Sequence, residues 1–298
     1  MEQAAAIAVF AYKRAEHLRR MLRSLAQNEQ LGQSLISIYC DGPRSDDEVR
    51  AVNEARAVAR ELAPAHARIV ERERNLGLAA SVIAGVSETI AAHGSAIVLE
   101  DDLELSPFAL GYFNAALARY RDEERVMHVA GFMYPVRAAL PESFFYREAT
   151  CFGWATWARA WRHFETDGNR IRQAVLERDA RAQFNAGAMD FLSMLEAQIA
   201  GRVDSWAIRW YGSLWLHDGL ALHPGRSLVR NTGFDGSGVH SGTSDNWEVE
   251  LGSSPVTRFP QRIAEEPAAA RAMTAWRKWQ GRRERLQALR GWFSRLTG

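Results

Sequence analysis

The sequence predicts an α/β protein with a mostly parallel sheet and helices on both of its faces. Two observations predict this class: short apolar runs typical of buried strands alternate with longer segments of helical periodicity, and the strands end in polar turns. The apolar fraction of 47% and the mean hydropathy of −0.28 are ordinary for a soluble protein with a sizeable core. At 298 residues the chain could form one large domain or two small ones.

The first half of the chain carries a regular succession of expected elements. Strands are expected at residues 7–10, 35–40, 67–71, 96–99 and 126–130. The helix after the first strand is indicated by apolar residues at helical spacing, namely Leu18, Met21, Leu22 and Leu25. Ser45 and Glu48 have the spacing of a capping box and predict the start of a second helix, and a third is expected at about residues 78–92.

The stretch Glu100-Asp101-Asp102 follows the fourth strand directly. Burying three carboxylates is costly without compensation, so a cation is expected to meet them where the strand ends. Ligands of open α/β sheets bind beyond the carboxyl ends of the strands, and a hard divalent cation between a carboxylate and a diphosphate suits such a turn. Ser106 and Pro107 then predict the start of a helix. The alternative interpretation is a solvated acidic loop.

The pattern changes after Gly131. Aromatic residues are dense between residues 144 and 157, and residues 231–244 have the glycine, serine and threonine content of a mobile loop, which contains His240. The remaining expected elements are a helical stretch and two short strands, at residues 170–217, 221–223 and 227–230. The expected organisation is one half at 1–131, a second half of the same domain at 132–262, and a C-terminal helix at 263–298.

The net charge and the cysteine content bear on the partners and the cellular compartment of the protein. The net charge of +1 gives no general argument for nucleic-acid binding. Cys40 and Cys151 have no metal or disulfide spacing, which fits a reducing compartment. Residues 4–10 are too short to span a bilayer and lack a basic flank, so neither a signal peptide nor an anchor is expected. The expected location is therefore the cytoplasm.

The C-terminal segment is strongly basic. From Arg271 onward it carries eight arginines and lysines against one acid, Glu284, interleaved with tryptophan, phenylalanine and leucine. A basic helix of this kind can lie on an anionic membrane surface, here the inner face of the cell membrane. The alternatives are packing on its own domain or on a second subunit.

Several short motifs occur together in a characteristic order, at residues 9–14, 39–42, 74–77, 100–108, 153–154, 203–206 and 238–241. Jointly they resemble those of nucleotide-sugar glycosyltransferases of the GT-A fold, particularly N-acetylglucosaminyltransferase I and bacterial family-2-like glycosyltransferases. The acidic segment followed by Ser-Pro-Phe is fairly specific, whereas the others are individually weak. The resemblance implies a Rossmann-like sheet with a C-terminal acceptor-side half. It covers about residues 7–244.

The resemblance implies roles on the donor side. Asp102 would ligate Mn²⁺ or Mg²⁺, Asp101 would touch the ribose or the donor sugar, and Glu100 would accept a hydrogen bond from a sugar hydroxyl. Asp41 would recognise the nucleobase, with a UDP-sugar favoured, and Arg14 would lie near the base or the phosphates. The competing interpretations are a simple Asp-Gly-Pro turn for Asp41 and a strand-end cap for Arg14.

Further roles concern the pocket wall, the metal and the acceptor side. Asn75 would form part of the donor pocket or cap the following helix. Asp204 would be the general base of an inverting transfer, or it would cap the helix beginning near Ser205; Asp190, Asp218 and Asp235 are weaker candidates. His240 would complete the metal shell or touch a phosphate, unless it is merely structural. Trp154 and Trp206 would face the acceptor, with core packing as the alternative for Trp154.

The expected function is thus a metal-dependent hexosyl- or N-acetylhexosaminyltransferase, acting on a glycan or lipid-linked acceptor in bacterial polysaccharide biosynthesis. Three alternatives stay open at this point. A sugar-1-phosphate nucleotidyltransferase would need a glycine-rich loop after the first strand, where the chain instead has Ala11-Tyr-Lys-Arg14. A non-catalytic nucleotide-sugar or glycan-binding relative would bind without turnover. A scaffold that uses only its basic tail would not bind nucleotides.

Overall fold

The computed structural model describes residues 4–186, 189–236 and 247–296, and for residues 284–296 it describes the backbone alone. The strands are β1 (Ala6–Ala11), β2 (Ile36–Cys40), β3 (Arg68–Glu71), β4 (Ser95–Glu100), β5 (Leu103–Leu105), β6 (Val126–Ala130), β7 (Ser143–Tyr146), β8 (Trp154–Trp157), β9 (Leu220–Pro224) and β10 (Val229–Asn231). The α-helices are α1 (Ala15–Leu25), α2 (Val49–Leu62), α3 (Leu78–His93), α4 (Ala109–Arg119), α5 (Ala158–Trp161), α6 (Gly168–Glu177), α7 (Arg181–Phe184), α8 (Phe191–Ile199), α9 (Trp206–Leu216) and α10 (Pro267–Leu296). Two short 3₁₀ helices, Glu29–Gln33 and Asp46–Glu48, precede β2 and α2.

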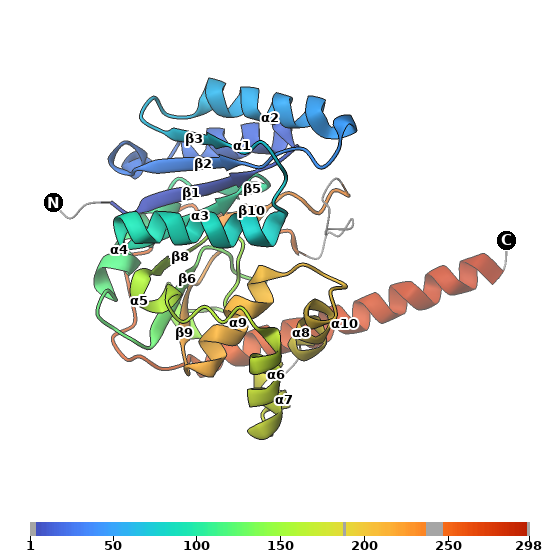
Figure 1. Cartoon of the computed structure of the whole chain (residues 1–298). Coiled ribbons are helices and arrows are strands. Elements are labelled where there is room, and N and C mark those ends of the chain that lie inside the picture. Colours follow the sequence, from blue (N-terminus) through green and yellow to red (C-terminus); the bar gives the residue numbers. More distant parts are fainter. Residues whose placement is uncertain (1–3, 187–188, 237–246, 297–298) are drawn as a thin grey trace.

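One eight-stranded sheet, in the order β3-β2-β1-β4-β8-β6-β9-β7, forms the centre of the molecule (Figure 1). The four strands β3, β2, β1 and β4 are parallel to one another. Strand β8 runs antiparallel to both β4 and β6, so the sheet becomes mixed in its second half. Because β1, β2 and β4 are parallel neighbours, the residues that follow them meet at one edge of the sheet.

Alternation along the strands distributes the core over both faces of the sheet. In β4, Ile97 and Leu99 pack with α1, α2 and α4, whereas Ala96 and Val98 face the opposite side and pack with α3 and α9. Each of these four side chains is at most 1% exposed. The predicted fold class, an α/β sheet flanked by helices on both faces, is therefore confirmed.

The segment after the acids differs from its prediction. A short strand, β5, intervenes between the acidic stretch and the helix and pairs antiparallel with β10. Helix α4 begins only at Ala109, and the buried Ser106 hydroxyl donates a hydrogen bond to the carbonyl of Gly252 at 2.6 Å. The prediction of a helix start at Ser106 and Pro107 is wrong because pairing with β10 keeps the chain extended beyond the acids. This pairing fixes where the acidic residues sit.

Helix α10 begins against the body and then leaves it (Figure 1). Ala269, Met273 and Trp276 are buried in a cluster with aromatic residues that include Phe132 and Tyr134. The first part of the helix therefore packs on its own chain, one of the alternatives considered for the basic segment. Within the described residues, no helix is both long and apolar enough to cross a membrane.

Candidate active site

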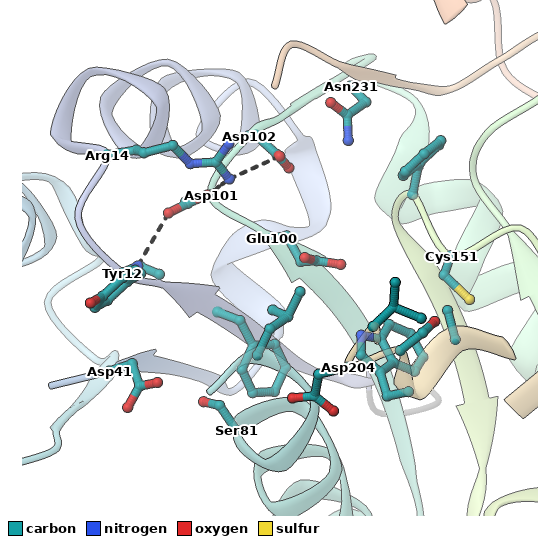
Figure 2. Close-up of a pocket in the computed structure, with 18 of the residues that line it drawn as sticks. Tyr12, Arg14, Asp41, Ser81, Glu100, Asp101, Asp102, Cys151, Asp204 and Asn231 are labelled. Carbon is teal, nitrogen blue, oxygen red and sulfur yellow. Dashed lines mark hydrogen bonds and ion pairs between the residues drawn. The ribbon is translucent and has the colours of Figure 1, made fainter. Parts of the chain in front are cut away.

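A cavity of about 480 Å³ opens where β1, β2 and β4 end (Figure 2). The loops after these strands form one side of it, and α8 together with the start of α9 contributes another part of the lining. Its charged and polar lining includes most of the residues singled out in the sequence, namely Arg14, Asp41, Asn75, Glu100, Asp101, Asp102 and Asp204. Side chains separated by almost 200 residues in the chain are thus brought to one place.

Arg14 is the cation that meets the buried acids. Its Nη2 lies 2.9 Å from Oδ2 of Asp102 and also forms an ion pair with Asp101. Asp101 additionally accepts a hydrogen bond from the backbone N–H of Tyr12 at 3.2 Å. The two aspartates are only 4% and 7% exposed, so their charges require such a partner. The sequence prediction placed Arg14 near the base or phosphates, whereas in the protein alone it lies on the carboxylates.

The electrostatics of this group follow from burial and mutual repulsion. Burial alone would lower the pKa of Arg14, but attraction to Asp101 and Asp102 outweighs it and raises that pKa. Burial raises the pKa of Asp101 despite the neighbouring guanidinium. Burial, followed by the charges of Asp102 and Asp101, raises the pKa of Glu100 to about 8. Glu100 is therefore largely protonated near neutral pH.

The segment after β10 closes over Asp102. The backbone N–H of Thr232 donates to the carbonyl of Asp102 at 2.7 Å. A Cβ added to Gly233 would lie 2.3 Å from Oδ2 of Asp102 and 2.9 Å from Nη1 of Arg14, so a larger residue here would displace these side chains. Asn231, which sequence reasoning missed, also lines the cavity. The predicted metal ligand His240 lies outside the described residues.

Asp41 and Asn75 connect the loop after β2 to the loop after β3 through hydrogen bonds. Asp41 accepts hydrogen bonds from the backbone N–H groups of Gly42 and Leu76, at 2.9 and 3.0 Å. The Asn75 amide donates to the carbonyl of Gly42 at 2.8 Å, and its oxygen accepts from the N–H of Gly77. The N-cap of α3 is Gly77, without a side-chain cap, so Asn75 does not cap this helix. Both side chains line the cavity and also hold its wall.

Glu48 fastens the loop after β1. Its carboxylate accepts hydrogen bonds from the Tyr12 hydroxyl and from Nζ of Lys13, the latter at 2.6 Å. The bonds to Lys13 and Tyr12 lower the pKa of Glu48 to about 2, and burial followed by the bond to Glu48 raises the pKa of Tyr12 to about 12. The predicted capping box is wrong, since Ser45 makes no side-chain cap and Glu48 binds this loop instead. Tyr12, a cavity residue, lies within the motif at residues 9–14, but only Arg14 of that motif was assigned a role from the sequence.

Asp204 lies just before α9 and faces the cavity (Figure 2). The side chain that caps α9 is Ser205, whose hydroxyl accepts from the N–H of Ile208. The capping interpretation of Asp204 is therefore wrong. Its Oδ2 lies 3.6 Å from the position of a Cβ on Gly77, which places Asp204 beside the start of α3.

Of the other acidic and aromatic residues predicted for the site, some line the cavity and others do not. Asp190 caps α8, and neither Asp190 nor Asp218 lines the cavity. Trp206 lines the cavity although it is only 3% exposed. Trp154 is 0% exposed and stacks on Trp206 at 5.3 Å between ring centroids. The prediction that Trp154 faces the acceptor is therefore wrong, because β8 is a central strand buried on both faces and the Trp154 ring packs in the core.

Asp235 interacts with His17 of α1. Its Oδ2 is 3.2 Å from Nε2 of His17, and His17 also contacts the carbonyl of Thr232. Asp235 does not line the cavity. Among the four aspartates considered as the general base, Asp204 is thus the one with its carboxylate in the cavity lining.

Replacing Glu100 by glutamine should stabilise the protein increasingly as the pH rises from 5 to 8. Between about pH 4.5 and 8 the unfolded chain loses the Glu100 proton while the folded protein keeps it, so stability falls with rising pH. Glutamine removes this cost, on the order of 2–4 kcal/mol at pH 8. Thermal denaturation at both pH values measures the difference. Glu104→Gln, which alters an ion pair with Arg230, should show no comparable pH-dependent gain, and an equal gain there would contradict the assignment.

Comparison with known proteins gives a distant structural likeness. No family model matches the sequence, and no curated protein matches it. Among solved structures, the crystal structure of GalNAc-T7 with UDP, GalNAc and Mn²⁺ is 10% identical with a TM-score of 0.46, and covers 76% of this chain and 43% of its own. The mannosyltransferase PcManGT from Pyrobaculum calidifontis, in complex with GDP-Man and Mn²⁺, is 12% identical with a TM-score of 0.37, covering 71% and 74%. This chain spans less than half of the GalNAc-T7 chain, and at such similarity neither structure assigns an activity.

Proposed function

We propose that this protein is a metal-dependent glycosyltransferase that moves a sugar from a nucleotide-sugar donor to a hydroxyl of a glycan or lipid-linked acceptor, with inversion. One observation carries the proposal. A single cavity contains a charged group at the end of β4, formed by Asp101, Asp102 and Arg14, and a separate carboxylate, Asp204, at the start of α9. The first group can contribute to binding a leaving diphosphate, and the second can take the proton of an acceptor hydroxyl.

The donor fits along the edge formed by β2, β1 and β4. The Tyr12 ring, with the Arg44 guanidinium 5.8 Å from its centroid, lies in the same lining as Asp41 and supports a nucleobase there. A UDP-sugar is the favoured donor. Its diphosphate would then reach Arg14 and Asp102, and Glu100 would face the sugar. Because Glu100 is largely protonated near neutral pH, it would donate as well as accept hydrogen bonds.

The residues present could hold a divalent cation only if phosphate oxygens of the donor supplied some of its ligands. Within the described residues, no group of three histidine, cysteine or acidic side chains could hold a metal. Arg14 uses Oδ2 of Asp102 and leaves Oδ1 as a hard oxygen ligand. Mg²⁺ at such sites is commonly held by one or two carboxylates plus substrate phosphates and water. Bound Mn²⁺ or Mg²⁺ would supply positive charge for the departing diphosphate.

Asp204 would act on the acceptor. Its carboxylate would take the proton of the attacking hydroxyl as the oxygen–C1 bond forms. The bond between C1 and the phosphate oxygen breaks, and its electron pair leaves with the nucleoside diphosphate. Trp206 and the exposed side chains of Met194 and Val203, 44% and 41% exposed, give this part of the cavity apolar surface for an acceptor.

Nucleotide binding tests the proposal. Uridine and guanosine diphosphates, with and without Mn²⁺, should raise the melting temperature, and the largest shift should need both components. Asp102→Ala should abolish the metal-dependent part of the shift, whereas Glu104→Ala, at an ion pair two residues further on, should retain it. Absence of any shift with every nucleotide and metal would refute the proposal. Binding without turnover on any acceptor would instead indicate a non-catalytic relative.

The proposal includes a membrane surface for the far end of α10. The support is the seven basic residues from Arg271 onward, not counting the buried Arg277, against the single acid Glu284, together with the departure of the helix from the body (Figure 1). The protein should sediment with vesicles that contain anionic phospholipid and remain in the supernatant with purely zwitterionic vesicles. Equal behaviour with both vesicle types would remove this part of the proposal.

A further inference from the structure

We propose that Arg14 is a resident counter-ion that keeps divalent cations off Asp102 until a nucleoside diphosphate takes over its guanidinium. Metal and nucleotide would then bind as a cooperative pair, and the metal alone would bind weakly. This inference rests on the proposed function and adds a binding order to it. It concerns the same side chain that the sequence placed near the base or phosphates.

The contacts make Arg14 and a metal direct competitors. One guanidinium nitrogen serves both Asp101 and Asp102, and the Arg14 side chain is only 19% exposed. A cation on Asp102 would share its carboxylate with this guanidinium, and the two positive charges would repel each other at close range. Since Asp101 is held by Arg14 and by the N–H of Tyr12, it offers the cation no easy alternative.

The surrounding chain restricts how this competition can be relieved. Gly233 packs so closely against Oδ2 of Asp102 and Nη1 of Arg14 that a single added methyl group would overlap both. Thr232 fixes the backbone of Asp102 through bonds from its N–H and hydroxyl to the carbonyl, at 2.7 and 3.0 Å. These contacts hold the Asp102 backbone in place beside Arg14, and Gly233 leaves the carboxylate little room on its own side. The side chains of Arg14 and Asp102 therefore have room to move toward the cavity, which both of them line.

A diphosphate that enters from the cavity offers the Arg14 guanidinium new oxygen acceptors, which can replace the carboxylates of Asp101 and Asp102. Arginine binds phosphate oxygens in a bidentate manner, so turning from the carboxylates to the diphosphate preserves its charge-assisted bonds. Oδ2 of Asp102 is then released beside Oδ1, and the diphosphate adds oxygen ligands for the cation. By linkage, the factor by which nucleotide strengthens metal binding equals the factor by which metal strengthens nucleotide binding.

Mn²⁺ binding measured by electron paramagnetic resonance and calorimetry tests the inference without any turnover. For the wild-type protein, Mn²⁺ alone should bind weakly, and saturating UDP should tighten it by about tenfold or more. Arg14→Gln should bind Mn²⁺ alone about tenfold more tightly than wild type, with weaker UDP binding and reduced cooperativity. Arg14→Lys, whose ammonium can engage one carboxylate at a time, should fall between them and covers the case that the glutamine variant does not fold.

Arg230 provides the matched control for loss of a positive charge. It pairs with Glu104 at 2.7 Å on the neighbouring β10–β5 ribbon and does not line the cavity. Arg230→Gln should change Mn²⁺ affinity less than twofold. The inference is overturned if both Arg14 variants bind Mn²⁺ alone no more tightly than wild type, or if UDP leaves the Mn²⁺ affinity of wild type unchanged. If neither UDP nor guanosine diphosphate binds with Mn²⁺ in any combination, the proposed function itself fails.

Discussion

Replacing Asp204 by asparagine should lower kcat by about 10²–10⁴-fold while donor binding stays close to wild type. Asparagine keeps the size and polarity of the side chain but cannot accept the acceptor's proton. Ser205, not Asp204, caps α9, so the helix should be undisturbed. Steady-state turnover with the identified donor and acceptor, together with the nucleotide-induced shift in melting temperature, measures the two effects separately.

Asp190 supplies the control for this experiment. It precedes α8 as Asp204 precedes α9, but it caps its helix and does not line the cavity. Asp190→Asn should retain kcat within a few-fold, because asparagine is also a good N-cap. If Asp204→Asn retains full turnover, or loses nucleotide binding along with turnover, Asp204 is not the general base.

Replacing Arg277 by methionine should lower the free energy of unfolding by about 3–5 kcal/mol. Arg277 lies on α10 with 1% of its side chain exposed, and it forms an ion pair with Glu148, whose side chain is 5% exposed. Its guanidinium also stacks 4.9 Å from the centroid of the Tyr134 ring. Methionine fills part of the space but leaves the Glu148 carboxylate buried without its cation. Denaturant-induced unfolding measures the loss.

Two further variants separate this ion pair from general effects on α10. Arg271→Met, at an exposed position of the same helix, should change stability by less than about 0.5 kcal/mol. Adding Glu148→Gln to Arg277→Met should recover part of the lost stability, since glutamine removes the uncompensated charge and can still accept the bond from the Tyr134 hydroxyl. A double variant no more stable than Arg277→Met alone would contradict the charge argument.

The ion pair between Arg277 and Glu148 also connects α10 to a segment that lines the cavity. Glu148 lies three residues before Cys151, and Cys151 and Phe152 line the cavity. The Glu148 carbonyl accepts a hydrogen bond from His223, and the Thr150 carbonyl accepts one from His128. Both histidines are fully buried. The base of α10 is thus joined to the segment that forms one side of the site. The sequence gives no sign of this connection, because Arg277 is only one of the eight basic residues of a segment predicted to lie on an anionic membrane surface or to pack on a protein.

The sequence by itself determined the elements that depend on local pattern. The alternation of apolar runs and amphipathic segments predicts the strands β1, β2, β3, β4 and β6 and the helices between them, since burial on a sheet face imposes its period on the residues. It also determined that Asp41, Asp101 and Asp102 follow strand ends. Parallel strands bring such residues to one edge, so much of the candidate site could be predicted without coordinates.

Only the tertiary structure decided which partner each side chain takes. Arg14 pairs with acids almost 90 residues away, Glu48 with the loop after β1, and Arg277 with Glu148, all through contacts that no local spacing encodes. The structure likewise separated Trp154 in the core from Trp206 in the cavity lining. Local propensity acts over a few residues, whereas the cost of burying a charge is met by whichever opposite charge the fold brings within reach.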